Sequence, residues 1–432
     1  MYTTRSGLIP SAGVMGRSLA LAILLPAAAA CVGGSTDAAQ AERAQGVTAI
    51  VGGLVYPAPD AAPIANGVVL IEGERIAAMG ARDAVEIPRG ATRIDAGGGA
   101  VLAAFWNSHV HLFEPRWQGS DTLAAGAIES LLREMYTRYG FAHVVDIGSL
   151  PGVTLPLRQR VRAGEIAGPD IRTALIPFVP PNGTPRYIEP LVLPELRSAQ
   201  DARDSVRARV TQGADGIKLF TMPITRRTPF PVMDATVVQA VAEAAHAAGR
   251  FVVAHPTDLP GVRVAVENGV DVLAHTTPES GPLPDALLRE MVDRQMALVP
   301  TLTLWELDVA GDSATIRAFV SAAQEQVSAF AGLGGRILFG TDAGYIPAYD
   351  PAREFELMAG AGLDARAILT SLTTAPAARF GAADRTGQLG AGYDADIVIV
   401  DGDPWQDLRA LTRVRLTMKR GRVLYEAPTR ER

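Results

Sequence analysis

The stretch Phe105-Trp106-Asn107-Ser108-His109-Val110-His111 follows an apolar run over residues 100–104, and it decides how this chain is expected to fold. The apolar run predicts a buried strand. His109 and His111 are two residues apart, so on an extended chain their side chains project from the same face. Two neighbouring imidazoles at a strand end form a pair of nitrogen ligands that suits zinc. Taken alone, such a pair is weak evidence for a metal site, and two polar residues in a loop is the favoured interpretation.

The composition predicts a globular protein with a sizeable core. The chain has 432 residues, of which 48% are hydrophobic and 20% are charged, enough for one large domain and a smaller one. The formal net charge is −6, and no Lys/Arg cluster interleaved with aromatic residues occurs, which argues against nucleic-acid binding. A single cysteine excludes an internal disulfide and a cysteine-based zinc site.

The first 30 residues have the layout of a secretory signal peptide. Arg5 and Arg17 precede an apolar run over residues 19–30, which ends in small residues. The run is too short to span a membrane comfortably. The sequence therefore predicts an exported, periplasmic protein whose signal peptide covers residues 1–30.

Ala28-Ala29-Ala30-Cys31 also resembles a bacterial lipobox, in which the cysteine is lipidated and becomes the new N-terminus. Leucine is more usual at the position of Ala28, so plain cleavage near Ala30 remains the alternative. A lipid on Cys31 would attach the protein to the membrane of the bacterial envelope. Residues 31–46 are small and polar and are expected to form a tether.

Both ends of the remaining chain show short β-like runs separated by turn residues. Neither end has enough strands for a good core alone, so together they predict one small β-sandwich domain over residues 47–99 and 385–426. The candidate strands of this domain are residues 47–51, 67–72, 74–79, 395–400, 414–418 and 421–425.

Between the two ends, short apolar runs alternate with helix-like segments, a pattern typical of parallel β/α structure. The clearest helix covers residues 235–248, with Pro231 before it and Gly249 after it. Eight such units over residues 100–384 predict a (β/α)8 TIM-type barrel. A doubly wound open sheet is the alternative, but no Gly-x-Gly-x-x-Gly follows the first strand. The candidate barrel strands are residues 101–106, 142–147, 172–178, 216–220, 251–254, 270–274, 298–301 and 337–340.

The C-terminal ends of barrel strands converge on one mouth, so polar residues that close the strands are expected to meet there. Four of the six histidines occupy such positions. Neutral imidazoles and a carboxylate are ligands that suit zinc and related metals. The residues concerned are His109 and His111 after the first strand, Lys218 in the fourth, His255 after the fifth, His275 after the sixth and Asp342 after the eighth.

Lys218 lies inside an apolar strand, where an unpaired ammonium is costly. Burial and nearby dications should lower its pKa. The neutral amine could then react with carbon dioxide to give a carbamate, which acts as a long carboxylate able to bridge two metals. A snorkelling or salt-bridged lysine is the alternative interpretation.

With these six residues in place, the chain resembles the amidohydrolase superfamily, specifically its members with two metal ions and a carbamylated lysine in the fourth strand. It looks like the branch that includes imidazolonepropionase-like proteins and metal-dependent prolidases. The resemblance covers nearly all of the mature chain. It implies that His109, His111 and Asp342 hold one metal, that His255 and His275 hold the second, and that the carbamate on Lys218 bridges both.

Two positions depart from the pattern of many relatives, which have Pro-Gly where this chain has Ala103-Ala104 and aspartate where it has Asn107. These differences affect the surroundings of His109 and leave the ligands themselves unchanged. The expected mechanism uses a hydroxide that bridges two divalent ions, with zinc favoured. Asp342 would accept the hydroxide proton and pass it to the leaving nitrogen.

The sequence therefore predicts a hydrolase that cleaves a C–N bond in a dipeptide, an N-acyl amino acid or a cyclic amide. A lactonase or phosphotriesterase-like hydrolase is a second enzyme hypothesis, because the same hydroxide attacks esters. A one-metal deaminase fits Lys218 less well. A non-catalytic, exported metal-binding lipoprotein is the alternative outside enzymes. A small-molecule substrate is expected, and homo-oligomer formation stays open.

Substrate selection is expected in the loops after the strands. Arg226 and Arg227 follow the fourth strand and could bind a substrate carboxylate, with a solvated loop pair as the alternative. Tyr187, in a loop rich in Pro and Gly, and Tyr345, after Asp342, could add apolar walls.

Two other histidines are expected to have structural roles. His246 lies near a predicted helix end, where a capping or packing role is expected. His143 lies inside the second candidate strand and predicts a core histidine with a polar partner, and Asp146 follows it near the end of that strand.

Overall fold

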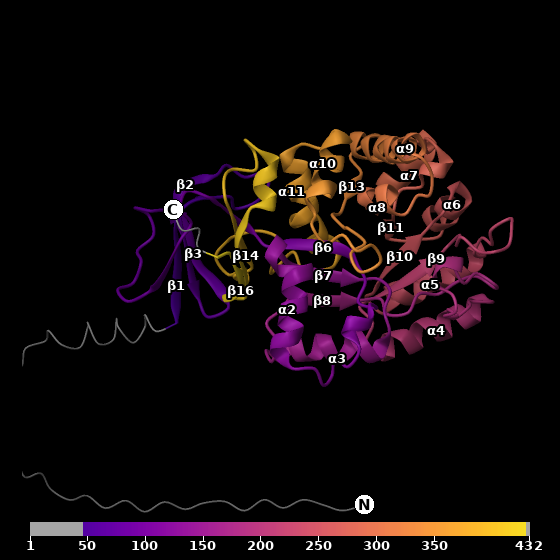
Figure 1. Ribbon diagram of the computed structural model, residues 1–432, viewed down its shortest axis with the longest axis horizontal. Helices are drawn as coiled ribbons and strands as arrows, with labels where there is room; N and C mark the ends of the chain where they lie inside the picture. The colour runs from indigo at the N-terminus through magenta and orange to yellow at the C-terminus, as the bar shows by residue number, and fades with distance from the viewer. Residues whose placement is uncertain (1–45, 429–432) are drawn as a thin grey trace, which may run out of the picture.

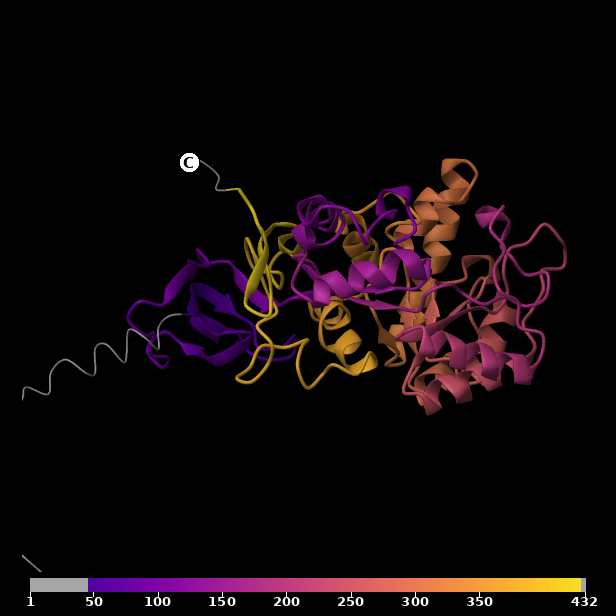
Figure 2. The same cartoon turned by 90° about the horizontal axis from the view of Figure 1, so that it is seen from below.

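The computed structural model describes residues 46–428. The predicted signal peptide, Cys31 and all but the last residue of the predicted tether lie outside the described residues. Within residues 46–428, the helices are too short or too polar to cross a membrane. The described chain forms a terminal sheet at one end of the molecule and a barrel at the other (Figures 1 and 2).

The terminal sheet is a mixed sheet built from both ends of the described chain, as the sequence predicts. Strand β5 lies at its centre, because it pairs parallel with β1 and antiparallel with β14. The strand order is β16-β15-β14-β5-β1-β2-β3, and β4 also pairs with β1. The strands are β1 (Val47–Val55), β2 (Ile64–Glu72), β3 (Arg75–Ala81), β4 (Thr92–Asp95), β5 (Ala100–Ala103), β14 (Ile397–Val400), β15 (Val414–Lys419) and β16 (Arg422–Glu426).

The barrel contains eight parallel strands in sequence order. They form two sheets, β6-β7-β8 and β9-β10-β11-β12-β13. A parallel bridge between Phe178 and Leu219 joins the sheets on one side, and a bridge between Val110 and Ala343 closes the other side. The strands are β6 (Phe105–Val110), β7 (Phe141–Asp146), β8 (Asp170–Thr173), β9 (Gly216–Phe220), β10 (Phe251–His255), β11 (Val272–Ala274), β12 (Ala297–Val299) and β13 (Arg336–Ile337).

Helices surround the strands and bury their apolar faces against them. The predicted helix over residues 235–248 is α5, which begins after Asp234, whose side chain accepts a hydrogen bond from the Thr236 N–H. The helices are α2 (Ala125–Met135), α3 (Pro151–Arg162), α4 (Ala199–Thr211), α5 (Ala235–Ala247), α6 (Leu259–Glu267), α7 (Asp285–Asp293), α8 (Leu302–Leu307), α9 (Ser313–Gly332), α10 (Ala352–Gly360), α11 (Ala365–Leu372) and α12 (Thr374–Arg379).

The first candidate barrel strand, residues 101–106, is wrong as a single strand. The chain passes from one sheet to the other at Ala104, whose N–H donates to the carbonyl of Asp396, while the N–H of Phe105 donates to Gly140. Strand β5 before this point belongs to the terminal sheet, and β6 after it belongs to the barrel. His109 therefore lies in β6, a strand separate from β5, and His111 directly follows it. The proposed domain boundaries at residues 99/100 and 384/385 remain a prediction.

Residues in the left-handed region follow several barrel strands, and the candidate strands over 172–178 and 298–301 end earlier than the sequence predicts. The candidate strand over 172–178 is interrupted by Leu175, which has φ 58°. His275 at φ 76° follows β11, Thr301 at φ 46° follows β12, and Asp342 at φ 59° follows β13. Such backbone conformations are costly for residues other than glycine, and they are often found at functional sites.

The barrel and the terminal sheet are joined by a buried polar contact. Nε2 of His143, on β7, lies 2.9 Å from Oδ2 of Asp396, which precedes β14. Oδ1 of the same carboxylate accepts a hydrogen bond from the Arg420 N–H at 2.8 Å. The prediction of a core histidine with a polar partner is confirmed for His143.

We expect Asp396→Ala to lower the free energy of unfolding by about 2–3 kcal/mol, because buried His143 would lose its carboxylate partner and the Arg420 N–H would lose its acceptor. Urea unfolding of the purified protein measures this change. Asp401→Ala is the matched control, since Asp401 is half-exposed and contacts only Arg415 at 3.4 Å. The control should change stability by about 0.5 kcal/mol or less. Equal effects of the two substitutions would contradict the proposed role of Asp396.

Candidate metal centre

Strand β6 and the segment after β13 bring two histidines and a carboxylate together. Nε2 of His109 lies 3.1 Å from Oδ1 of Asp342, and Nε2 of His111 lies 3.0 Å from the same oxygen. His109 is the penultimate residue of β6, and His111 directly follows the strand. Their side chains therefore face the same side, as their spacing predicts, and both point to one atom.

The close approach depends on two glycines in the sequence Gly340-Thr341-Asp342-Ala343-Gly344. A Cβ atom at Gly340 would lie 2.7 Å from the Cβ of His109 and 3.0 Å from its backbone nitrogen. Gly344 has φ +98°, and a Cβ atom there would lie 2.0 Å from the carbonyl oxygen of His111. Any side chain at either position would push the Asp342 segment away from β6.

Asn107 fixes the same contact from within β6. Its Nδ2 donates to Oγ1 of Thr341 at 2.8 Å, and its Oδ1 accepts from the Thr341 N–H at 3.2 Å and the His109 N–H at 3.3 Å. This buried amide uses both donor and acceptor capacity, which an ionised aspartate could not do. Asn107, which stands where many relatives have aspartate, therefore lies directly beside His109, as expected from the sequence.

Hydrogen bonds select the tautomer of two of the imidazoles. Nδ1 of His111 lies 3.0 Å from the carbonyl of Gly148, which can only accept, so Nδ1 carries the proton. Nδ1 of His275 lies 2.6 Å from Oγ1 of Thr301, whose hydroxyl donates to the Pro300 carbonyl at 2.8 Å. Because that hydroxyl has one hydrogen, Nδ1 of His275 is the donor. Nε2 of both rings is left with a free lone pair for a metal.

His255 and His275 extend the cluster that begins with His109, His111 and Asp342. The His275 ring is 4.5 Å from the His109 ring and 4.7 Å from the His255 ring, between centroids. One ligand atom each from His109, His275 and Asp342 lie within 4.8 Å of one another, close enough to share a metal ion. The structure thus brings all four predicted imidazoles into one cluster.

Lys218 faces the barrel interior. It pairs in register with Val253 of β10, and Val253 belongs to the apolar cluster inside the barrel. Its neighbours Ile217 and Leu219 pack instead into the layer between strands and helices. Lys218 is 2% exposed, so its amine is removed from water on the side where the imidazoles lie.

The buried position changes the charges of these groups. Burial lowers the pKa of Lys218 to about 7, although the charge of Asp342 opposes the shift. Burial lowers the pKa of His109 to about 4, again against Asp342, and it holds the pKa of His255 and of His275 well below the usual value. Neutral imidazoles and a partly neutral lysine amine are therefore present at neutral pH.

Burial alone would raise the pKa of Asp342, but the nearby imidazoles of His109 and His111 outweigh it and hold that pKa well below its usual value. Within the described residues, both ring nitrogens of His109 and Oδ1 of Asp342 are buried without a hydrogen-bond partner. Buried polar atoms normally have such partners. A cation bound between Nε2 of His109 and Oδ1 of Asp342 would satisfy these two atoms, so the donor set fits a divalent metal.

The predicted substrate-binding residues occupy two different places. The Tyr345 N–H donates to the carbonyl of Asp342 at 3.0 Å, and the Tyr345 ring is 5.6 Å from that of Tyr187. The two tyrosines therefore stand beside the metal centre. Arg226 and Arg227 are exposed, and Arg226 forms an ion pair with Glu189 at 2.7 Å. Binding of a substrate carboxylate by Arg226 would compete with this pair.

Three further polar residues, His246, Asp146 and Thr301, lie outside the predicted set of metal ligands. His246, at the end of α5, pairs with Asp271 at 2.9 Å, apart from the cluster. Oδ1 of Asp146 accepts from the Leu112 N–H at 3.2 Å, so Asp146 supports the segment that carries His111. Sequence reasoning missed Thr301, although it closes the seventh candidate strand, because a threonine carries no metal-ligand signal.

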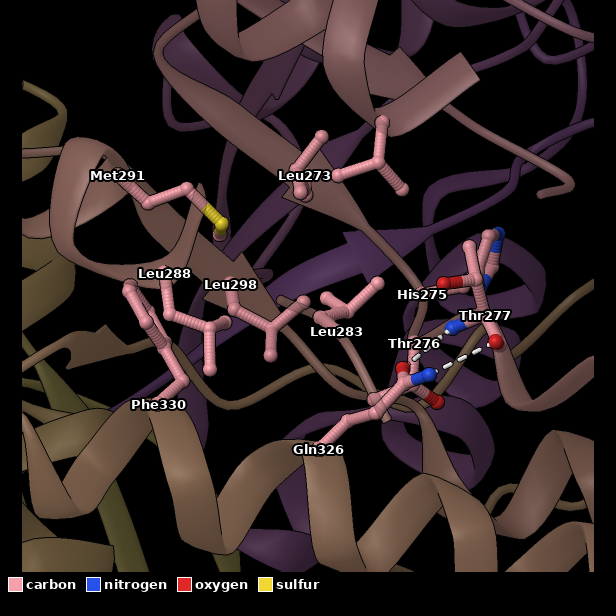
Figure 3. A pocket seen from close by; sticks show the side chains of 11 residues that line it. Leu273, His275, Thr276, Thr277, Leu283, Leu288, Met291, Leu298, Gln326 and Phe330 are labelled. Atoms are coloured by element: carbon pink, nitrogen blue, oxygen red, sulfur yellow. Dashed lines mark hydrogen bonds between the residues drawn. The ribbon is translucent and has the colours of Figure 1, made fainter. Parts of the chain in front are cut away.

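The loop after β11 is also held from outside the barrel. Gln326, on α9, accepts from the Thr277 N–H at 2.8 Å and donates to the carbonyls of Thr277 at 2.7 Å and Gly281 at 2.6 Å. Figure 3 shows the two bonds between Gln326 and Thr277 at one end of a narrow, mostly apolar cavity that His275 also lines. The loop that carries His275 is therefore anchored to an outer helix.

A parallel barrel with imidazoles, an inward lysine and a carboxylate at the C-terminal ends of its strands is the arrangement of a metal-dependent hydrolase. Residues 100–424 match the model of the amidohydrolase family, and the chain belongs to this family.

Known proteins with similar sequence or structure are prolidases, an ochratoxinase and other amidohydrolases. Ochratoxinase from Aspergillus niger is 24% identical over 421 residues, which cover 87% of this chain and 84% of that protein. The structure of a Xaa-Pro dipeptidase with bound methionine has a TM-score of 0.75 and 22% identity, and it covers 88% of this chain and 100% of the other. A prolidase complexed with N-methylphosphonate-L-proline has a TM-score of 0.73, 23% identity and the same coverage.

We expect zinc to stabilise metal-free protein, because the folded state presents the ligand cluster and the unfolded state does not. At a free zinc concentration of 100 times the dissociation constant, the gain in unfolding free energy should be about 2.7 kcal/mol. Thermal unfolding with and without zinc measures it. His109→Ala should remove most of the gain, whereas the control His246→Ala should keep it. Wild-type stabilisation of the His109→Ala protein by zinc would contradict the assignment of this site.

Proposed function

We propose that the protein hydrolyses a C–N bond in a dipeptide, an N-acyl amino acid or a cyclic amide at a centre of two divalent metal ions. The observation that carries this proposal is the convergence of His109, His111, His255, His275, Lys218 and Asp342 at one mouth of the barrel. In this proposal His109, His111 and Asp342 would hold one ion, His255 and His275 would hold the other, and Lys218 as a carbamate would supply oxygen ligands to both.

The ions, when bound, lower the pKa of water and polarise the carbonyl of the substrate. Asp342 is placed to accept a proton from the attacking water and to deliver it to the leaving nitrogen. Its low pKa keeps it ionised and therefore able to accept that proton. The neutral amine of Lys218 adds to carbon dioxide and loses a proton, which gives a carbamate with two oxygens for the metals.

The known structures of similar fold support an amide substrate. They include a Xaa-Pro dipeptidase and a prolidase with a phosphonate analogue of a proline dipeptide. A dipeptide contains an amide bond, and a water molecule activated by metal ions can attack the carbonyl carbon of such a bond.

The mouth of the barrel favours an apolar group next to the scissile bond. The ring of Phe113, which is 43% exposed, lies 5.3 Å from that of His111. Tyr187, which is 38% exposed, packs edge-on against Tyr345 beside Asp342. Aromatic surfaces that remain exposed at a binding site bury apolar ligand surface. We therefore propose that the substrate carries an aromatic or large aliphatic group.

The test is a screen of zinc-loaded protein against dipeptides, N-acyl amino acids, cyclic imides and lactones. We expect turnover of an amide with an apolar side group, and a loss of about 10²–10⁴-fold in kcat for Asp342→Asn. Asp293→Asn, at the exposed end of α7, is the control and should keep full activity. Turnover of lactones alone would favour the lactonase hypothesis. Tight zinc binding without turnover of any class would favour a metal-binding lipoprotein.

The carbamate has a test of its own, because the chain contains two lysines, Lys218 and Lys419. Metal-free protein is loaded with zinc and ¹³C-bicarbonate, and its ¹³C NMR spectrum is recorded. We expect a carbamate resonance in the wild type and in Lys419→Arg, and none in Lys218→Arg, which also should bind less zinc. A resonance that persists in Lys218→Arg, or none in the wild type, would refute the carbamate.

We also propose that the protein is exported to the periplasm by the segment over residues 1–30, with lipidation of Cys31 as one outcome and plain cleavage as the other. Mass spectrometry of the mature N-terminus from expressing cells distinguishes the two.

A further inference from the structure

Glu354 is a buried carboxylate that the proposed reaction does not use. It lies on α10, outside the barrel, and is 1% exposed. Burial raises its pKa to about 7, although three hydrogen bonds to the carboxylate oppose the shift. A buried carboxylate is costly, so its retention here calls for a specific role.

The carboxylate binds the segment that follows β12. Its Oε1 accepts from the Leu302 N–H at 2.8 Å, and its Oε2 accepts from the N–H and the hydroxyl of Thr303, each at 2.8 Å. These bonds satisfy the free N–H groups at the beginning of α8. They also fix the residue that comes immediately before them, Thr301.

Thr301 is the link to the metal centre. It has φ 46°, and its Oγ1 lies 2.6 Å from Nδ1 of His275. A threonine in the left-handed region is strained, so the surrounding structure must hold it there. Glu354 accepts three hydrogen bonds from Leu302 and Thr303, the two residues after Thr301, and these bonds supply that restraint. The chain of contacts from Glu354 through Thr301 therefore ends on a ring whose Nε2 is a proposed ligand.

We propose that Glu354 is a positioning residue that holds Thr301, and through it the ring of His275, in the orientation that binds metal. The role rests on the proposed metal centre and not on the identity of the substrate. His275 itself has φ 76° and is restrained on its other side by Gln326 on α9 (Figure 3). Side chains on two outer helices, Gln326 on α9 and Glu354 on α10, thus restrain His275 through the segments after β11 and after β12.

The test compares zinc affinity and the visible spectrum of the cobalt-substituted protein. Glu354→Gln replaces one acceptor oxygen by an NH2 group. This group would face a backbone N–H and cannot accept a hydrogen bond from it. We expect about tenfold or more weaker binding of one zinc ion and an altered cobalt spectrum. Glu356→Gln is the matched control, because Glu356 is exposed on the same helix and pairs with Arg353 at 2.8 Å. It should leave both readouts unchanged.

A double-mutant cycle tests the path through Thr301. Thr301→Val removes the hydroxyl, and we expect it to weaken zinc binding as Glu354→Gln does. The double variant should be no weaker than either single variant, because both changes release the same ring. Additive losses would mean that Glu354 acts by another route. Wild-type zinc affinity in folded Glu354→Gln protein would overturn the proposal.

Thr303→Val covers the case in which Glu354→Gln does not fold. It removes one of the three bonds to the carboxylate and leaves both backbone bonds intact. We expect a several-fold loss of zinc affinity with the circular dichroism of the wild type, and no loss would count against the proposal. Since these readouts need no substrate, a failed activity screen would leave them interpretable.

Discussion

Oxygen Oδ1 of Asp342 lies within 3.1 Å of two imidazole nitrogens, and this contact constrains the rest of the structure. Three atoms that carry lone pairs repel one another at that distance unless a cation or a proton lies between them. The chain brings them together by closing the barrel, because β6 and the segment after β13 are neighbours only in a closed ring. Gly340 and Gly344 then remove the side chains that would keep these two segments apart.

Burying these polar groups costs free energy, and the packing of the surrounding apolar layers offsets this cost. The barrel interior below the site contains an apolar cluster that includes Trp106 and Val253, and a larger apolar layer separates the strands from the helices. Burial in this apolar environment lowers the pKa of Lys218 and of three of the clustered histidines, His109, His255 and His275, which prepares them as metal ligands. The same apolar environment therefore stabilises the fold and makes the ligand chemistry available at neutral pH.

Much of the site could be predicted from the sequence, because its ligands sit at the ends of apolar runs with clear periodicity. His109, His255, His275 and Asp342 each follow or end such a run, and a parallel barrel brings the ends of its strands to one mouth. The structure places the rings of His109 and His275 4.5 Å apart and those of His255 and His275 4.7 Å apart, between centroids. The strand order and the bridges between strands confirm the predicted barrel and the sheet built from both ends of the described chain.

Other features depend on contacts that no local pattern encodes. The transfer of the chain between sheets at Ala104 follows from its bond to Asp396, nearly three hundred residues further along, so residues 100–106 looked like one strand. The early end of the third barrel strand follows from the positive φ of Leu175, a residue type that gives no sign of it. Glu354 meets Leu302 across 52 residues, and a glutamate on an amphipathic helix normally indicates a solvent-exposed face.

The two sides of the metal centre are held by different means, and this difference has a physical consequence. His109 and Asp342 are fixed by backbone pairing, glycine contacts and Asn107, all of which belong to the closure of the barrel. His275 contacts the Thr301 hydroxyl, and side chains on α9 and α10 bind Thr277 and Leu302 in the segments that carry these two residues. A change on the first side opens the barrel, whereas a change on the second side leaves the strands paired. Metal affinity can therefore vary through the outer helices while the fold is preserved.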